Sequence, residues 1–158
     1  MKLEVDSMIR KAVGAIIYQE DEILLVHKVK MSEAKSGPEK IVGEWDFPKG
    51  GVKPTDFNLE EALLRELYEE TGSKEYQIKG KFDQKVCFEF SQDIKEKIGY
   101  DSQETTMFYV EFQGERALLQ PIDDEISQVK FVKRDKVLDE LSYGETKEYY
   151  RLVVIKRC

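Results

Sequence analysis

The chain has 158 residues, 41% of them apolar, and this suits one compact domain (1–158) with a sizeable core. No run approaches the roughly 18 apolar residues of a membrane span, and the charged start MKLEVDSMIRK is unlike a signal peptide, so we expect a cytoplasmic protein with no membrane partner. The formal net charge of −7 argues against bulk electrostatic binding to nucleic acid. Two cysteines and one histidine exclude most zinc and triad chemistry, which leaves carboxylates to carry catalysis.

The first half of the chain predicts a β-hairpin, a loop and a helix. Residues 12–18 and 23–27 are short β-branched apolar runs on either side of the polar QEDE, a pattern typical of paired strands. Residues 28–43 are polar, contain Gly37 and Pro38, and predict a loop. The segment LEEALLRELYEETG (59–72) consists of strong helix formers and ends at a glycine, so it predicts a helix.

The second half predicts three strands and then helical segments. The strands are expected at 82–90, 106–112 and 126–132, with a polar connection, SQDIKEKIGYDSQE, between the first two. Residues 135–156 predict one or two helices with a break near Gly144. Strands and helices interleave without a βαβ rhythm, so the expected fold class is α/β (α+β) with a mixed β-sheet.

The predicted helix carries three carboxylates on the side that should face the core. At about 100° per residue, Glu66 and Glu70 lie within about 20° of Leu59, and Glu69 lies beside them. Clustered like charges raise a carboxyl pKa unless a cation lies among them, and Mg²⁺ is the natural counter-charge because it binds carboxylate oxygens and bridges to phosphates. Arg65, one turn before Glu69, can hold that carboxylate by an i,i+4 pair.

Glutamate-rich runs are also common on solvated helices, so the segment before the helix matters for this interpretation. It reads PKGG, and glycine allows a backbone to approach a ligand closely. Lys49 and Lys53 bracket the two glycines with positive charge suited to phosphate. This context favours a phosphate and metal site over a solvated helix face.

Residues 50–73, GGVKPTDFNLEEALLRELYEETGS, resemble the Nudix box. That motif reads Gly, five residues, Glu, seven residues, then Arg-Glu-apolar-x-Glu-Glu-x-Gly-apolar, and residues 65–72 match its second half without a gap. The order of strands and helices along the rest of the chain is also similar to the family. The resemblance implies a Nudix-type α/β/α sandwich with a mixed β-sheet.

This sequence departs from the family pattern in two places. Asp56 stands where the family has glutamate, and eight residues rather than seven separate it from Arg65. Ser73 replaces the usual apolar residue after the glycine. Because the family's first glutamate supports the loop rather than the main metal, these departures bear on loop geometry more than on catalysis. They also leave open a catalytically inactive nucleotide-binding module, although three inward carboxylates argue against it.

The resemblance implies a Mg²⁺-dependent hydrolase, with Mn²⁺ as a substitute, in which metal-activated water attacks an acid anhydride of a nucleoside polyphosphate. The catalytic residues would be Glu69, Glu66 and Arg65, with the arginine orienting a glutamate. Glu69 or Glu66 is the favoured base, and a carboxylate from a later loop is the alternative. A late acidic loop often adds a metal ligand, and we choose Glu125 there over Asp123 and Asp124. The complete set of expected metal ligands is Gly50, through its carbonyl, with Glu66, Glu69, Glu70 and Glu125.

The segment WDFPKGG (45–51) is similar to the W-x-F-P-(K/Q)-G signature of the branch that includes dinucleoside polyphosphate hydrolases and RNA 5′-pyrophosphohydrolases. The expected substrate is therefore a dinucleoside polyphosphate. The 5′-triphosphate end of RNA, an oxidised nucleotide and ADP-ribose are the alternatives, and the sequence leaves the oligomeric state open. The expected substrate-binding residues are Arg10, Lys11, Trp45, Lys49, Lys147 and Tyr149.

Overall fold

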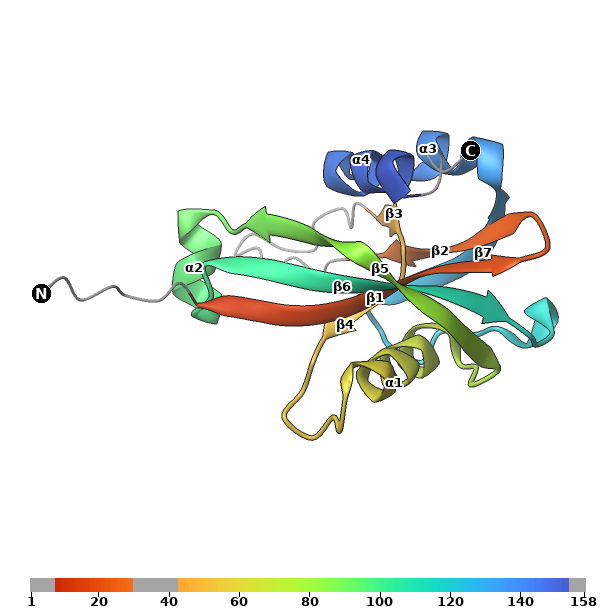
Figure 1. The fold of residues 1–158 in the computed structure, drawn as a ribbon, viewed down its shortest axis with the longest axis horizontal. Coiled ribbons are helices and arrows are strands. Elements are labelled where there is room, and N and C mark those ends of the chain that lie inside the picture. Colours follow the sequence, from red (N-terminus) through yellow and green to blue (C-terminus); the bar gives the residue numbers. More distant parts are fainter. Residues whose placement is uncertain (1–7, 30–42, 154–158) are drawn as a thin grey trace, which may run out of the picture.

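The computed structural model describes residues 8–29 and 43–153, which form the sheet and helices of Figure 1. The strands are β1 (Ile9–Gln19), β2 (Glu22–Lys28), β3 (Glu44–Asp46), β4 (Lys49–Gly51), β5 (Tyr76–Glu89), β6 (Ser102–Phe112) and β7 (Ile126–Lys133). The helices are α1 (Leu59–Thr71), α2 (Gln92–Ile98), α3 (Val137–Glu140) and α4 (Gly144–Val153), with short 3₁₀ turns at Arg116–Leu118 and Arg134–Lys136.

All seven of these strands belong to one mixed sheet. Its main path is β3-β2-β1-β6-β5, with β4 paired to β1 and β7 paired to β2. Strands β1 and β6 run parallel, in register from Ile9 opposite Ser102 to Tyr18 opposite Glu111. The other pairs are antiparallel. The mixed sheet expected from the sequence is therefore confirmed.

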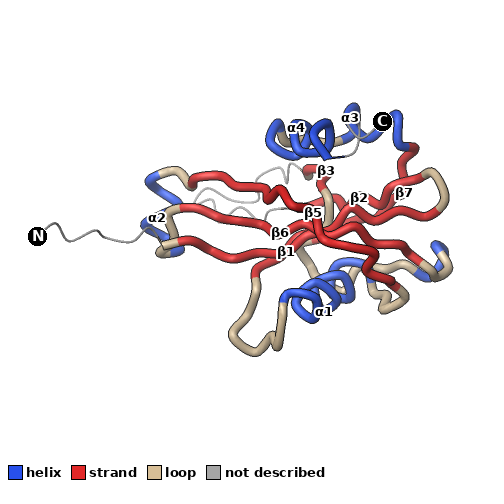
Figure 2. Tube along the Cα trace, in the orientation of Figure 1, coloured by secondary structure: helices blue, strands red, loops and turns tan. Residues whose placement is uncertain are grey.

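Helices cover both faces of the sheet, α1 on one side and α3 with α4 on the other (Figures 1 and 2). Because side chains alternate along a strand, β1 contributes to both cores. Val13, Ala15 and Ile17 pack with the buried face of α1, whereas Ile16 packs with Tyr150 of α4. This arrangement confirms the α/β/α sandwich.

Helix α1 begins and ends where the sequence predicts. The Asn58 side chain accepts a hydrogen bond from the Glu61 N–H (2.8 Å) and caps the first turn. Gly72 ends the helix at φ 73°, a left-handed conformation that glycine adopts without strain. Leu59 stays 37% exposed, whereas three apolar residues of the helix face that packs on the sheet are fully buried: Ala62, Leu63 and Leu67.

Several segments differ from the sequence-based expectation. The polar connection after β5 contains helix α2, which spans seven residues, has no buried residue and carries only Ile94 and Ile98 as apolar side chains. Strands β1, β5 and β6 begin earlier than expected, at Ile9, Tyr76 and Ser102, and the short strands β3 and β4 were not expected. The break near Gly144 is confirmed, since α4 begins there.

Most of the expected loop 28–43 lies outside the described residues. No helix within the described ranges is long and apolar enough to cross a bilayer.

Candidate active site

A pocket of about 630 Å³ lies where β4, α1, the start of α4 and the loop before β7 meet. Its polar lining divides into carboxylates and cations. The carboxylates are Asp46, Glu66, Glu69, Glu70, Asp123, Glu125 and Glu145, and the cations are Arg10, Lys28, Lys49 and Lys53.

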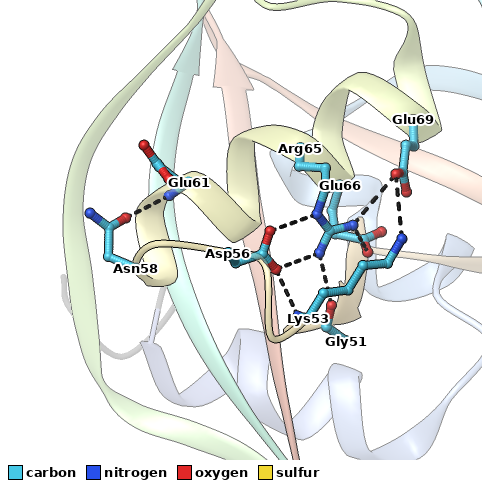
Figure 3. A network of polar contacts seen from close by, with 8 residues as sticks. All are labelled: Gly51, Lys53, Asp56, Asn58, Glu61, Arg65, Glu66 and Glu69. Atoms are coloured by element: carbon cyan, nitrogen blue, oxygen red, sulfur yellow. Dashed lines mark hydrogen bonds and ion pairs between the residues drawn. The ribbon is translucent and has the colours of Figure 1, made fainter.

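Arg65 is the centre of the polar network beside this pocket (Figure 3). Its Nε and Nη2 donate to the two Asp56 oxygens (2.9 and 2.8 Å), and Nη2 also donates to the Gly51 carbonyl (3.0 Å). Its Nη1 donates to Glu66 Oε1 (2.8 Å) and, at 3.5 Å, to Glu69 Oε1. The expected i,i+4 contact with Glu69 is therefore present, but the shorter bonds tie α1 to the preceding loop.

Asp56 closes the loop between β4 and α1, although this loop has one residue more than the family pattern. Its carboxylate accepts a third hydrogen bond from the Lys53 N–H (2.7 Å), and its own N–H donates to the Lys53 carbonyl (2.9 Å). The bonds from Arg65, followed by the one from the Lys53 backbone, lower the Asp56 pKa to about 2. The residue is thus ionised at neutral pH and supports the loop, as the resemblance implied.

Glu66 lies directly against Gly50, across the gap between α1 and β4. A Cβ atom at position 50 would stand 1.9 Å from Glu66 Cδ, so only glycine leaves room for this carboxylate. Glu66 is 8% exposed, and burial raises its pKa, although the Arg65 bond opposes that effect. The box glycine and the first box glutamate are therefore packed as one unit.

Glu70 is the most deeply buried of the three glutamates. It is 4% exposed, and its Oε2 atom is buried with no hydrogen-bond partner in the described part of the chain. Burial raises the Glu70 pKa to about 8, and the nearby carboxylates of Glu66, Asp46 and Asp123 add to the rise, while Lys28 opposes it. A buried, unsatisfied carboxylate oxygen among other carboxylates is a position that a cation would satisfy.

The raised Glu70 pKa predicts how stability depends on pH when divalent cations are removed. Between the ordinary value of 4.5 and about 8, the folded protein holds a proton that the unfolded chain releases. Glu70 thus contributes stability that is fully present below pH 4.5 and is lost as the pH rises toward 8, by about 1.4 kcal/mol per pKa unit. Denaturant unfolding in chelator should show a steeper decline for the wild type than for Glu70→Gln, and equal slopes would contradict the assignment.

The residues of this site fit a hard divalent cation. Within the described ranges, no three acidic side chains converge as a ready-made metal cluster, and Arg65 bridges Glu66 and Glu69 instead. The unsatisfied Glu70 oxygen and the close approach of Glu66 to Gly50 nevertheless supply the carboxylate and backbone oxygens that such a cation binds. All five expected ligands line the pocket together: Gly50, Glu66, Glu69, Glu70 and Glu125.

The acidic loop before β7 is held against the end of α1. The N–H groups of Ile122 and Asp123 both donate to the Glu69 carbonyl, at 2.9 and 2.8 Å. Glu125, the residue chosen from the sequence, lines the pocket. Asp123 lines it too and acts electrostatically on Glu70, so the structure brings two carboxylates of this loop to the site.

Two cations in the pocket share a buried carboxylate. Asp46 is 3% exposed and pairs with Lys28 (3.4 Å) and Lys49 (3.2 Å). Burial lowers the pKa of Lys49, and the charge of Asp46 opposes that loss. Lys49 and Arg10 line the pocket as expected. Lys28 and Asp46 line it too but were not predicted. Lys28 ends a strand that has no motif, and Asp46 occupies the variable position of the W-x-F-P-(K/Q)-G signature.

Two expected substrate contacts near the first strands do not line the pocket. Lys11 follows Arg10 on β1, so its side chain points to the other face of the sheet, where it pairs with Glu104 (3.0 Å). The ring of Trp45 packs against His27, with centroids 4.8 Å apart, and the Lys130 ammonium lies over it at 3.9 Å. Trp45 thus contributes to packing at the edge of the core.

The tail residues also differ from the expectation. Tyr149 is 5% exposed, packs in the core on the α4 side of the sheet, and donates from its hydroxyl to the Gln84 carbonyl (2.7 Å). Lys147 is not among the residues that line the pocket. The tail instead reaches the pocket through Tyr143 and Thr146, at the start of α4. Lys147 and Tyr149 were expected from the resemblance of the tail to the family, whereas the turn of about 100° per helical residue decides which α4 side chains face the pocket.

Known proteins share both the sequence and the fold of this chain. Residues 8–153 match the model of the NUDIX domain. An RNA pyrophosphohydrolase of Sulfurovum sp. (strain NBC37-1) is 31% identical over 116 residues, which cover 72% of this chain and 73% of that protein. The crystal structure of a MutT protein from Methanosarcina mazei Go1 superposes with a TM-score of 0.69 at 22% identity, covering 98% and 99% of the two chains. A C. elegans Ap4A hydrolase complex gives 0.63 at 18% identity, covering 90% and 93%.

The matched family model and the shared fold thus define the class of the chain, an α/β/α Nudix domain. The chain belongs to the Nudix family, and it is a pyrophosphohydrolase. Enzymes of this family use divalent metals and act on nucleotide substrates.

Proposed function

We propose that this chain is a Mg²⁺-dependent enzyme that hydrolyses a phosphoanhydride bond in the 5′-polyphosphate of a nucleotide. The observation that carries the proposal is the lining of one pocket by clustered carboxylates and by four cationic side chains. Carboxylates alone would repel a polyphosphate, whereas cations alone could not hold a metal. Their combination suits the joint binding of a divalent metal and its phosphate ligand.

The metal would be held by the carboxylates of Glu66 and Glu70 and the carbonyl of Gly50. When bound, Mg²⁺ neutralises phosphate charge and lowers the pKa of water. Glu69 is our choice for the base that accepts the proton of the attacking water. Its side chain is 32% exposed and its Arg65 bond is long at 3.5 Å, so it is more accessible to water than Glu66, whose side chain is 10% exposed and bonded at 2.8 Å.

The other residues bind and orient rather than react. Arg65 keeps Glu66 and Glu69 in place through bonds to both carboxylates. Lys28 and Lys49 would contact the phosphate chain, with Asp46 holding the two ammonium groups near each other. Arg10 lines the same pocket from β1. Cations at fixed positions stabilise the charge that develops on the phosphate leaving group.

Two substrates agree with these features. The 5′-triphosphate end of RNA is supported by the Sulfurovum relative, which is called an RNA pyrophosphohydrolase. A dinucleoside polyphosphate is supported by the signature at 45–50 and by the fold shared with the Ap4A hydrolase. The overall charge of −7 does not oppose binding of an RNA end, because Arg10, Lys28, Lys49 and Lys53 place positive charge among the carboxylates of the pocket. We therefore propose the 5′-triphosphate end of RNA as the first candidate substrate and a dinucleoside polyphosphate as the second.

The experiment is a substrate panel with the purified chain and Mg²⁺. The panel contains 5′-triphosphate RNA, a dinucleoside tetraphosphate, ADP-ribose and an oxidised nucleoside triphosphate, and kcat/KM is measured for each. We expect the first two to be the best substrates and chelator to abolish their turnover. No turnover of any of them, together with no binding of Mg²⁺ or Mn²⁺, would support the nucleotide-binding module instead.

A further inference from the structure

Part of the pocket is apolar, and neither the metal nor the phosphate chemistry explains it. Phe88 and Phe90 line the pocket from β5 and its end, and each is only half-buried. Ile94 of α2 lines it as well and is 41% exposed. Single exposed apolar side chains are common, but an apolar patch within a ligand-sized pocket marks a surface that an apolar group of a ligand can cover.

The two phenylalanine rings form a fixed corner. Their centroids are 5.1 Å apart and their planes meet at 87°, an edge-to-face pair. Such a corner presents one ring face and one ring edge, which together suit a flat group of similar size. We call the surface made by Phe88, Phe90 and Ile94 the aromatic corner.

A row across the sheet connects the aromatic corner to the phosphate end of the pocket. Phe88 of β5 lies opposite Gln103 of β6, and Gln103 lies opposite Arg10 of β1. The Arg10 Nη1 atom donates to Gln103 Oε1 at 2.5 Å. The Arg10 guanidinium in turn reaches Gly51 of β4, where a Cβ atom would stand 2.4 Å from Arg10 Nη2. The order is thus aromatic ring, amide, guanidinium and Gly51, the residue after the box glycine Gly50.

We propose that the aromatic corner binds the nucleobase of the substrate by stacking, with Arg10 on the phosphate side of the same nucleotide. This inference rests on the proposed function and deepens it, because it places the nucleoside at the β5–α2 end of the pocket. A base has an aromatic face whatever its identity, so stacking alone holds all four bases. Purines, which have the larger face, bind more tightly than pyrimidines.

The Gln103 amide supports Arg10 rather than reading the base. Its Oε1 accepts from Arg10, and its Nε2 donates to Thr105 Oγ1 at 3.3 Å. Gln103 is 9% exposed, so these two bonds hold the amide within the sheet surface. The corner therefore selects for the presence of a base and discriminates only weakly among bases.

The test measures binding without turnover, in the full chain with Mg²⁺. The probes are the non-hydrolysable imidotriphosphates of adenosine, guanosine, cytidine and uridine, together with imidodiphosphate, which has no base. Phe88→Ala and Phe90→Ala should each weaken purine nucleotide binding by about 5- to 150-fold, the range for losing one stacked base. Neither variant should change the affinity for imidodiphosphate.

Three further variants separate stacking from other effects. Phe88→Tyr keeps an aromatic face and should restore nucleotide affinity. Ile98→Ala removes a similarly exposed α2 side chain (43%) that does not line the pocket, and it should have no effect. Gln103→Ala should weaken nucleotide and imidodiphosphate binding equally, because it acts through Arg10. Thermal unfolding of every variant shows that the fold is retained, and Phe88→Leu replaces Phe88→Ala if the latter does not fold.

Each outcome decides the proposal. It is supported if the alanine variants lose nucleotide affinity alone and if wild-type affinities for the four nucleotides lie within about tenfold of one another. It is overturned if nucleotide affinity is unchanged in both variants, if imidodiphosphate affinity falls as much, or if one base is preferred more than about 100-fold. Failure of the proposed function would appear separately, as wild-type protein that binds nucleotides but hydrolyses no polyphosphate.

Discussion

Glu69→Gln is expected to lower kcat by on the order of 10²–10⁴-fold, the usual contribution of a positioned base. The amide is nearly isosteric and can still accept the long bond from Arg65 Nη1, but it cannot take a proton from water. Stability should change little, because Glu69 is the most accessible of the three glutamates. Steady-state kinetics with the best substrate of the panel provide the measurement, and thermal unfolding checks the fold.

Glu60→Gln is the matched control, since it removes a carboxylate from the exposed first turn of the same helix. It should keep wild-type kcat and KM. Near-normal turnover of Glu69→Gln would show that another carboxylate is the base. A fall in Mg²⁺ affinity that accounts for the whole loss would show that Glu69 acts as a metal ligand only.

Gly50→Ala should abolish most of the activity while leaving the fold nearly intact. The new Cβ would stand 1.9 Å from Glu66 Cδ, and the carboxylate can swing away because it ends a flexible side chain. The substitution therefore disrupts the site rather than the fold, because the Glu66 carboxylate would move away from Gly50 and lose its bond from Arg65 Nη1. We expect kcat to fall by at least about 10²-fold, as when a positioned catalytic group is displaced, and Mg²⁺ affinity to fall with it.

Two other glycines serve as comparisons. A Cβ at Gly51 would meet Arg10 Nη2 at 2.4 Å, so Gly51→Ala should mainly raise KM by moving a substrate-binding cation. A Cβ at Gly80 would meet nothing within 4 Å, so Gly80→Ala should be neutral. If Gly50→Ala keeps full activity, the packing of Gly50 against Glu66 is not part of the site.

The box helix was predictable because its signals are local. The strong helix formers and the glycine at the end of the helix, Gly72, lie within one segment, and the 3.6-residue period fixes which side chains share a face. The same period placed Glu66 and Glu70 inward, and both are buried. Helix α2 was missed because it is short and polar, and its two isoleucines are too few to distinguish a helix from a charged connection.

The pocket-lining residues of the strands were harder to predict because they come from strands that are separate in the sequence. Strand register decides whether a side chain faces the pocket, and a shift of one residue moves it to the other face. Arg10 therefore lines the pocket while its neighbour Lys11 pairs with Glu104 on the opposite side. Phe88 meets Gln103 and Arg10 only through pairing of β5, β6 and β1, which no local pattern reveals.

The amino-acid sequence by itself determined the helix, its inward carboxylates and the kind of chemistry that these residues support, because each depends on spacing within one segment. The tertiary structure decided which cations face those carboxylates, that Asp46 joins Lys28 to Lys49, and that an aromatic corner opens into the same pocket. These features join residues far apart in the chain. Their proximity depends on sheet order and register, which the long-range packing of both cores sets together.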